Sequence, residues 1–554
     1  MMNMKKIYDI LLDGWRPFIW IVLLIGAVYS ASLSFGFTFL DDHEFIVENY
    51  DFIKDISNIG RAFTQTIFAN INVPYYRPIL SLSFILDAQI GGTAPLIYHL
   101  TNIALHSAVS CLLFLLLYRI AGRRDISFVL ASIFAVHPVL TQAVAWIPGR
   151  NDLLLGFFIL PSFLALLKYL ASGSFVSYFF SIFLFGLALF TKESAIVMPV
   201  LYVLFISQGR SGPNICKVFF GLTIGWASVV AFWILMRAAT LVSSCDKSTF
   251  WGMWGAVSKS APAFIQYLGK IFIPFNLSVY PTIHDTGFLY GVISALALSS
   301  LFLLSKKKDW HLIIFGGTWF LLFLFFSFIR PSPECVLDFQ EHRLYLPMIG
   351  FMVMLLGVSW IKEIDLKNSA VFIFFLSMVI LFSLLTFRHE MNFRDKRTFW
   401  DNAVKTSPNA AFIHLRYGFI SYMDGLMDKA ESEYKKAIEL DPELSAVHAK
   451  LGLLYMDKKM YNEAVTEFRE EIRLSPRYDT AYMCMGVVRY RQGKPEDAVR
   501  LWKQAIRINP YSIDARKNLA VYYQQTGDRA RASCYARQLF DMGFPVPEDL
   551  LKGQ

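Results

Sequence analysis

The run GWRPFIWIVLLIGAVYSASLSFGF, residues 14–37, decides the fold of this chain. Its 24 residues are almost wholly apolar. As a helix rising about 1.5 Å per residue, such a run can cross a hydrocarbon layer about 30 Å thick. Three acids, Asp41, Asp42 and Glu44, follow within a few residues. A chain that leaves a membrane thus places a cluster of carboxylates directly at its exit.

Similar apolar runs recur outward from this one, for example LIIFGGTWFLLFLFFSFI at 312–329 and VFIFFLSMVILFSLLTF at 371–387. Of the 554 residues, 55% are hydrophobic and only 17% are charged, whereas soluble domains carry about a quarter charged residues. The sequence therefore predicts an all-α, polytopic membrane protein whose first run is a retained helix. About eleven transmembrane helices are expected, at residues 15–35, 95–119, 126–145, 152–171, 175–191, 193–208, 216–237, 286–304, 310–329, 343–361 and 369–388.

Short basic segments fix the expected orientation. MMNMKKIYD (1–9), YRIAGRRD (118–125), SQGRSGPNICK (207–217) and SKKKDWH (305–311) all fall on the same side of the predicted spans. Positive charge in short loops is typical of the cytoplasmic side. We therefore expect a cytoplasmic N-terminus and a C-terminal part outside the cytoplasm, with a bacterial inner membrane favoured and an endoplasmic reticulum left open.

The loops on the opposite side share one outer surface. They hold Asp41 and Asp42, the segment WIPGRND (146–152), the segment TKES (191–194), the long segment 238–285 and the segment PECVLDFQEHRLY (333–345). Ionisable groups at membrane depth are costly and usually mark functional sites. The acids after the first span therefore belong to an expected outward-facing site that several loops assemble. The alternative is that they are solvated charges at helix ends.

A repeat of 34 residues fills the C-terminal part. Gly418, Gly452 and Gly486 keep this spacing, and so do Ala430, Ala464 and Ala498; Pro408, Pro442, Pro476 and Pro510; and the aromatic residues Tyr434, Phe468 and Trp502. This period is typical of tetratricopeptide repeats, an α-solenoid. We expect a membrane domain at 1–394, with a first outer loop at 36–94, and a repeat domain at 395–554, made of a half repeat at 396–410 and repeats at 411–444, 445–478, 479–512 and 513–546.

Four motifs, in this order and ahead of such repeats, carry a resemblance to a known family. They are YYRPILSLSFILDAQIGGTAPLIYHLTN (75–102), FAVHPVLTQAVAWIPGRNDLL (134–154), FTKES (190–194) and EHRLYLP (341–347). Together they resemble the transmembrane and tetratricopeptide-repeat protein O-mannosyltransferases, which are GT-C glycosyltransferases. The resemblance spans roughly residues 15 to 540. It implies a multi-helix GT-C membrane domain with an acidic pair in the first outer loop.

The resemblance also implies a chemistry, the transfer of a sugar such as mannose from a polyprenyl phosphate to a protein hydroxyl. A carboxylate must take the acceptor's proton, and cations must meet the charge on the leaving phosphate. We assign the base to Asp41, with Asp42 as the second choice. The expected phosphate partners are Arg77, Arg150, Lys192, Arg343 and His137. The expected supporting groups are Asp152, Glu193 and Glu341.

Two supporting assignments are specific enough to check. Asp152 is expected to orient Arg150, and Lys192 and Glu193 could form a structural ion pair at a helix end. The sequence departs from the family pattern at EHRLYLP, because His342 separates Glu341 from Arg343 where the family usually shows Glu followed directly by Arg. This departure weakens the assignments of both residues.

Other classes of function stay open at this point. A GT-C enzyme that acts on an envelope glycan or lipid is one, and a membrane-anchored scaffold without activity is another. A transporter is disfavoured because the polar residues lie at one face and not at the midplane. The repeats are expected to hold a protein or peptide acceptor in their groove, with a purely structural cap as the alternative.

Cofactor and nucleic-acid binding are not expected. The net charge of +9 lies largely in short loops beside apolar runs, and the six cysteines show no metal-binding spacing. Asp41, Asp42 and Glu44 offer oxygen ligands that suit a divalent metal, but the family resemblance argues against one. Cys245 and Cys335 both fall in outer loops, where they could form a disulfide.

Overall fold

The computed structural model describes residues 8, 10–66, 75–209, 215–241, 255, 257–329 and 339–552. Its described residues are mainly helices and turns, and an isolated bridge pairs Lys308 with Val358. The chain divides into two compact units, residues 1–407 and 408–554. The all-α fold class is thereby confirmed, while Cys245 and Cys335 lie outside the described residues.

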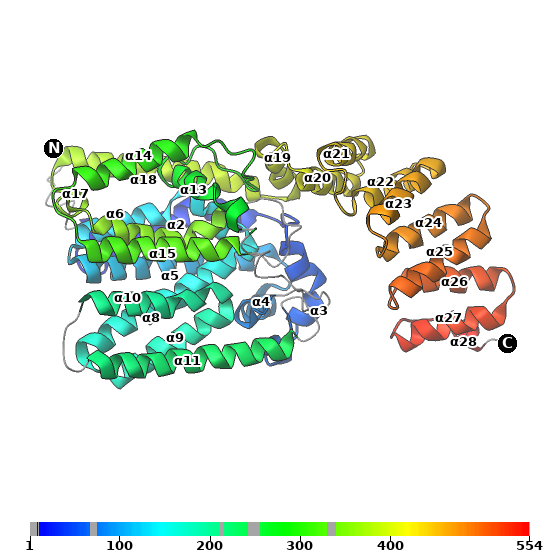
Figure 1. Ribbon diagram of the computed structural model, residues 1–554, viewed down its shortest axis with the longest axis horizontal. Helices are drawn as coiled ribbons and strands as arrows, with labels where there is room; N and C mark the ends of the chain where they lie inside the picture. The colour runs from blue at the N-terminus through cyan, green and yellow to red at the C-terminus, as the bar shows by residue number, and fades with distance from the viewer. Residues whose placement is uncertain are drawn as a thin grey trace. The chain divides into compact units, whose positions relative to one another are not determined.

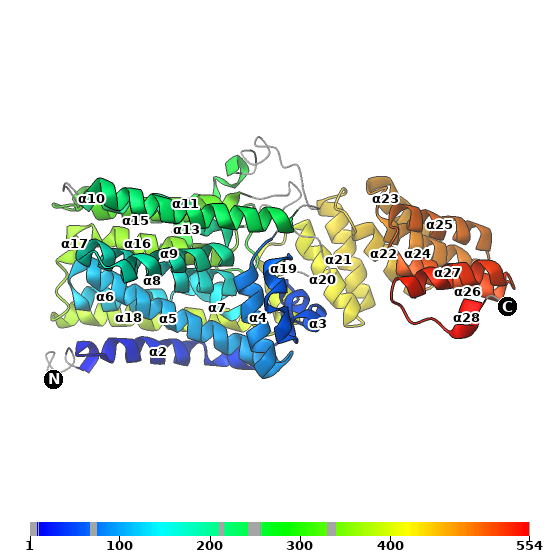
Figure 2. The ribbon, with the colours of Figure 1, turned by 90° about the horizontal axis from the view of Figure 1, so that it is seen from below.

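The first unit is a bundle of long helices that run side by side (Figures 1 and 2). Helix α5 lies at its centre and contacts α2, α4, α6 and α8. The helices are α2 (Arg16–Val28), α3 (Tyr50–Ile53), α4 (Pro78–Gly91), α5 (Pro95–Ala121), α6 (Arg124–Ala135), α7 (Thr141–Ala145), α8 (Arg150–Ser172), α9 (Phe175–Thr191), α10 (Met198–Gly209), α11 (Ile215–Thr240), α13 (Ala263–Phe272), α14 (Leu289–Leu304), α15 (Trp310–Phe328), α16 (Tyr345–Leu356), α17 (Ser359–Lys362), α18 (Ser369–Glu390) and α19 (Lys396–Thr406).

Among the described residues, five segments are long and apolar enough to cross a membrane: Pro95–Ala121, Ile147–Ser172, Val218–Thr240, Trp310–Phe328 and Ser369–Phe393. A sixth is present if α6 and the segment Pro138–Ala145, which meet at a bend of 50°, form one span. Pro138 explains this bend, because proline cannot continue the hydrogen bonding of a helix. Shorter apolar helices cover Arg16–Val28, Pro78–Gly91, Phe175–Thr191, Glu193–Gln208 and Leu289–Leu304.

Each span that the sequence predicts overlaps one of these helical segments or, at 343–361, helix α16. The total of eleven stays a prediction, because several of the helices are short. Helix α4 was not among the predicted spans. It lies inside the first outer loop, begins at Pro78, and buries Leu80, Phe84 and Ile85.

The second unit is a solenoid of helix pairs. Its helices are α20 (Ala411–Met423), α21 (Met427–Leu440), α22 (Val447–Asp457), α23 (Tyr461–Leu474), α24 (Asp479–Arg491), α25 (Pro495–Ile508), α26 (Ile513–Gln525), α27 (Arg529–Asp541) and α28 (Glu548–Lys552). The glycines permit close packing within each pair: a Cβ on Gly418 would lie 2.7 Å from the Tyr434 ring, and one on Gly452 would lie 2.8 Å from the Phe468 ring. The tetratricopeptide-like solenoid that the 34-residue period predicts is confirmed.

The fourth helix pair uses a different combination at the same two positions. Ala520 stands in the place of the glycine, and Ala536 stands in the place of the aromatic ring. Both alanines are buried. A small residue on each helix therefore replaces the pairing of glycine with a large ring.

Helix α19, which we expected to begin the repeat domain, belongs to the first compact unit. Trp400 of this helix is fully buried. Ser407 Oγ donates a hydrogen bond of 2.8 Å to the carbonyl of Tyr280, and Val279 N donates one of 3.2 Å to Asn402 Oδ1. The half repeat thus packs on the membrane unit, and the units divide at 407/408 rather than at 394/395.

Candidate functional site

The loop after the first apolar helix is organised around Asp42. This carboxylate is buried and accepts four hydrogen bonds, from Thr38 N (2.6 Å), Thr38 Oγ1 (2.8 Å), Phe39 N (2.8 Å) and His43 N (2.9 Å). Burial raises the pKa of Asp42 to about 7, although the hydrogen bonds favour its ionised form. Asp42 therefore fixes the shape of the loop, and both of its oxygens are occupied.

Asp41 stands beside it in a different environment. Its side chain is exposed, and its backbone has a positive φ of 68°. Phe39, two residues earlier, also has a positive φ, of 59°. Positive φ at residues other than glycine is uncommon and persists where surrounding contacts impose it. The loop that Asp42 holds therefore presents Asp41 outward on a constrained backbone.

Two buried indoles hold this loop from outside. Trp146 Nε1 donates to Leu40 O at 2.8 Å, and Trp400 Nε1 donates to Thr38 O at 3.1 Å. A backbone bond of 2.8 Å from Gly36 N to Arg394 O holds the beginning of the loop. These contacts join the first outer loop to the segment before α8, to the turn that follows α18 and to the half repeat.

The segment 142–152 is the centre of the candidate site. Besides reaching Leu40, Trp146 packs against the His342 ring with centroids 5.4 Å apart. Gln142 Nε2 donates to Gln340 Oε1 at 2.7 Å, and Gln142 Oε1 accepts from His342 N at 3.1 Å. The first, second and last of the predicted outer loops are therefore in contact, which supports the shared surface expected from the sequence.

Gly149 makes this segment compact. A Cβ at this position would lie 2.6 Å from the carbonyl oxygen of Ala143 and 2.8 Å from its Cα. These are backbone atoms, which cannot move aside as the end of a side chain can. Glycine is therefore required for the close approach of residues 142–143 and 149.

Arg150 is fully buried and pairs with Asp87, not with Asp152. The Arg150–Asp87 separation is 2.6 Å, and Arg150 also donates to Asn102 Oδ1 and to Tyr98 O, both at 2.8 Å. The expectation that Asp152 orients Arg150 is thus wrong. Because its donors are engaged inside the protein, Arg150 joins α4, α5 and α8 and is not placed to meet a phosphate.

The remaining charges of this face pair crosswise. Lys192 Nζ lies 2.7 Å from Asp152 Oδ1, and Arg77 makes a two-pronged contact with Glu193, at 2.7 and 3.2 Å. The proposed Lys192–Glu193 pair is therefore replaced by two long-range pairs. Both cations stay partly exposed.

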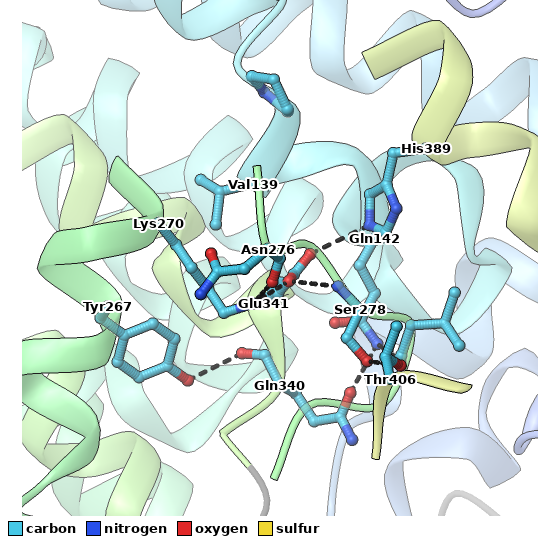
Figure 3. Close-up of polar contacts among 12 residues, drawn as sticks. Val139, Gln142, Tyr267, Lys270, Asn276, Ser278, Gln340, Glu341, His389 and Thr406 are labelled. Atoms are coloured by element: carbon cyan, nitrogen blue, oxygen red, sulfur yellow. Dashed lines mark hydrogen bonds and ion pairs between the residues drawn. The ribbon is translucent and has the colours of Figure 1, made fainter. Parts of the chain in front are cut away.

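Glu341 lies in a second, fully buried cluster (Figure 3). Glu341 Oε1 lies 2.6 Å from Lys270 Nζ and accepts from Ser278 N at 2.9 Å, and Glu341 Oε2 lies 3.1 Å from His389 Nε2. Lys270 also donates to Asn276 O at 2.8 Å. Despite the opposing effect of burial, the charge of Lys270 holds the pKa of Glu341 below its usual value.

The sequence reasoning missed Lys270 and His389, and also Asp87. A lone charge inside an apolar or amphipathic helix is a signal that it needs a buried partner, but it does not say which one. Glu341 was selected by motif, and the structure shows it tied to α13 and α18. It thereby fixes the loop that precedes α16.

His137 and Arg343 complete the predicted set. His137 Nδ1 accepts from Val139 N at 3.3 Å, and its Nε2 donates to Ile271 O at 2.9 Å. His137 therefore caps the break between α6 and α7 with both ring nitrogens engaged, and it is not placed to meet a phosphate. Arg343 lies in the short 3-10 helix Glu341–Leu344 and is partly exposed.

Of the site residues selected from the sequence, one carboxylate is exposed and three cations are partly exposed, on loops joined by direct contacts. The carboxylate is Asp41, and the cations are Lys192, Arg77 and Arg343. A carboxylate can take a proton from a hydroxyl, and cations can stabilise a phosphate. Within the described residues, no group of three or more His, Cys, Asp or Glu side chains is placed to hold a metal ion.

Comparison with known proteins gives three kinds of match. The tetratricopeptide-repeat family model matches residues 416–444 and 445–478. Protein O-mannosyl-transferase TMTC4 of Homo sapiens is 25% identical over 474 residues, which cover 73% of this chain and 64% of that protein. Protein O-mannosyl-transferase F38B6.6 of Caenorhabditis elegans is 25% identical over 450 residues, which cover 77% and 63%.

A third relative, protein O-mannosyl-transferase TMTC1 of Homo sapiens, is 26% identical over 494 residues, covering 75% of this chain and 54% of that protein. The chain therefore spans less than two thirds of the length of these relatives. Among solved structures, the crystal structure of MamA is 24% identical with a TM-score of 0.25, covering 28% of this chain and 90% of that one. The family resemblance is confirmed: over about three quarters of its length the chain is similar to protein O-mannosyl-transferases, and it carries tetratricopeptide repeats.

Proposed function

We propose that this chain is a membrane glycosyltransferase that moves mannose from a polyprenyl phosphate to serine and threonine hydroxyls of proteins outside the cytoplasm. The observation that carries the proposal is the first outer loop. Asp42 uses both of its oxygens to shape this loop, and Asp41 is left exposed at its tip. A scaffold protein has no need of such an arrangement.

Asp41 is the proposed base. It takes the proton from the acceptor hydroxyl as the hydroxyl oxygen bonds to the anomeric carbon, and the sugar–phosphate bond breaks. One base and no protein nucleophile give a direct displacement, which inverts the anomeric carbon. The alternative that Asp42 is the base loses support, because a proton on Asp42 would displace one of its four donors.

Lys192, Arg77 and Arg343 are the proposed phosphate partners. The leaving polyprenyl phosphate is already an anion, so it needs cations more than an acid. Lys192 and Arg77 are oriented by Asp152 and Glu193 respectively, so their positions are set before the donor binds. Arg150 and His137 are omitted from this set because their donors are used inside the protein.

The proposal includes an orientation, with a cytoplasmic N-terminus and the repeats outside. A compartment reporter fused after residue 554 tests it, and a cytoplasmic signal would contradict the shared outer surface. The repeat groove is proposed to hold the protein acceptor. Bound there, an acceptor would have a raised local concentration near the membrane unit, on the order of millimolar for short tethers.

The direct test is transfer by the purified full chain. The protein in detergent is incubated with polyprenyl-phosphate mannose and an unstructured Ser/Thr-rich protein. Mass spectrometry then locates added hexose, and NMR of the product gives its anomeric configuration. We expect hexose on Ser or Thr with inverted configuration. Hexose found only on added envelope lipid or glycan would move the acceptor to that class, and no consumption of the donor would contradict the proposal.

A further inference from the structure

Glu390, the last residue of α18, is fully buried, and neither of its carboxylate oxygens has a hydrogen-bond partner among the described residues. Its neighbours one helical turn away are tied on both sides. Thr386 Oγ1 donates to Val136 O at 2.8 Å, and Arg394 O accepts from Gly36 N at 2.8 Å. Glu390 thus lies between the broken helix α6–α7 and the start of the loop that carries Asp41.

Tyr29 at the end of α2 faces the same place. Its hydroxyl is buried without a hydrogen-bond partner in the described part of the chain, and helix α2 contacts helix α18, which ends at Glu390. Its ring packs edge-on against His106, with centroids 5.7 Å apart. The nearby Thr141 hydroxyl donates elsewhere, to Pro138 O at 2.7 Å. The Glu390 carboxylate and the Tyr29 hydroxyl are therefore both buried in this region without hydrogen-bond partners among the described residues.

This pair contrasts with the other buried carboxylates of the first unit. Glu341 has three partners, and Asp42 accepts four hydrogen bonds. Buried polar groups are nearly always satisfied, so exceptions call for an explanation such as a ligand. The expectation is stronger inside a membrane protein, where unpaired polar groups are costly and mark functional sites.

We propose that Glu390 and Tyr29 bind hydroxyl groups of the sugar on the lipid-linked donor. This inference rests on the function proposed above. A free carboxylate accepts hydrogen bonds from two adjacent hydroxyls, and a tyrosine hydroxyl can accept or donate a third. A phosphate would be repelled by the carboxylate. Glu390 also does not belong to any group of three or more His, Cys, Asp or Glu side chains that could hold a metal ion among the described residues.

The position of the pair agrees with this ligand. The anomeric carbon has to lie within bonding reach of the hydroxyl that Asp41 activates. The Gly36–Arg394 bond holds the root of that loop one helical turn from Glu390. A sugar bound to Glu390 would therefore lie beneath the first outer loop.

Binding of two lipids to the full chain tests the inference. The probes are polyprenyl-phosphate mannose and polyprenyl phosphate without sugar. The variants are Glu390→Gln, which keeps the shape, and Tyr29→Phe, which removes only a hydroxyl. Ser383→Ala is the matched control, because Ser383 lies in the same helix and its hydroxyl bonds to Val379 O of that helix at 2.8 Å.

We expect Glu390→Gln to weaken binding of the mannose lipid about tenfold or more, and Tyr29→Phe about threefold to tenfold, as for lost hydrogen bonds to buried polar groups. Binding of the lipid without sugar should stay unchanged in both variants, and Ser383→Ala should change neither affinity. Equal loss for both lipids would indicate a structural role and overturn the inference.

Wild-type affinity for the mannose lipid in both variants would also overturn it. If Glu390→Gln does not fold, Tyr29→Phe alone decides between these outcomes. The proposed function fails differently, because the wild-type chain would then bind neither lipid or would transfer no sugar. That result would contradict the proposed function and the sugar subsite together.

Discussion

Polar side chains are used in opposite ways in the two units. In the repeat unit, residues 414, 448, 482 and 516 share one repeat position but are His, His, Tyr and Arg. Three of them contact the carbonyl of the proline six residues earlier: His414 with Pro408 at 2.9 Å, Tyr482 with Pro476 at 3.1 Å, and Arg516 with Pro510 at 2.6 Å. Chemically different residues thus perform the same task.

In the membrane unit each polar contact occurs once and joins distant parts of the chain. Lys270 pairs with Glu341, Arg150 with Asp87, and Lys192 with Asp152. No repeat position offers an alternative partner if one is lost. We therefore expect substitutions to be tolerated at such positions of the repeats and to be poorly tolerated among the buried pairs of the membrane unit.

The largest expected effect follows from breaking the Lys270–Glu341 pair. Lys270→Met leaves a fully buried carboxylate with His389 and one backbone donor. Breaking a buried pair by removing one partner costs about 3–5 kcal/mol. We expect the free energy of unfolding to fall by this amount, measured by thermal unfolding of the full chain in detergent.

The matched control is Lys435→Met in the repeat unit. Lys435 pairs with Glu431 on an exposed helix face at 2.8 Å, and such pairs contribute about 0.3–0.5 kcal/mol. Similar losses in the free energy of unfolding for the two lysine variants would contradict the proposed difference between the units.

Gly149→Ala should have the next largest effect. Its new Cβ would lie 2.6 Å from Ala143 O, and backbone has to move to admit it. Forcing extra atoms into packed sites costs about 1–3 kcal/mol. Because the segment 142–152 holds the Asp41 loop, we expect reduced stability together with reduced transfer.

Gly486→Ala serves as its control, since the new Cβ there would meet the Trp502 side chain. We expect it to lower stability at the small end of the range and to leave transfer to a short peptide unchanged. Wild-type stability and transfer in Gly149→Ala would refute the central place given to residues 142–152.

The pH dependence of transfer tests the role of Asp42 in the loop that presents Asp41. Because burial raises the pKa of Asp42 to about 7, Asp42 is ionised and accepts its four hydrogen bonds above this pH. Below it, one oxygen carries a proton and the loop that presents Asp41 loosens. We expect initial rates to fall about fivefold from pH 7 to pH 6 as the ionised fraction falls. This acid limb should be absent in Asp42→Asn, and its persistence there would contradict the role of Asp42.

The smallest effect is expected at His414, which titrates in the opposite sense. Burial and the charge of Lys436 oppose its protonation, but hydrogen bonds to Glu433 and to the Pro408 carbonyl raise the pKa of His414 above 6.5. Its contribution to stability is therefore complete below pH 6.5 and is lost as the pH rises through the folded pKa.

His414→Tyr should keep the contact with Pro408, as Tyr482 does with Pro476. We expect a change in stability below about 1 kcal/mol and no remaining pH dependence at this position. Hydrogen exchange of residues 408–444, corrected for its intrinsic pH dependence, measures both. A large loss in this variant would show that the repeat position does not accept different residues.

The same contrast explains what the sequence could predict. The repeat helices and the glycine contacts with Tyr434 and Phe468 follow from local periodicity, because each contact lies within one repeat. The apolar helices and the break at Pro138 follow from local patterns as well. Helix α4 was missed because its apolar stretch is short and lies within a loop segment.

The partners of buried charges could not be predicted in this way. Lys192 and Glu193 are neighbours in the chain, yet each pairs with a residue far away, Asp152 and Arg77 respectively. Adjacent side chains at a helix end point in different directions, so proximity in sequence gave the wrong pair. Asp87, Lys270 and His389 showed no motif, and only the packing of helices reveals them.

The most direct test of the account is single-turnover transfer by Asp41→Asn compared with Asp51→Asn, both in the full chain with polyprenyl-phosphate mannose. Asp51 is an exposed acid of the same outer loop that pairs with Lys54. If Asp41 is the base, its variant should bind the donor normally and lose about 10² or more in rate, while Asp51→Asn keeps the wild-type rate. Near-normal transfer by Asp41→Asn would contradict the account.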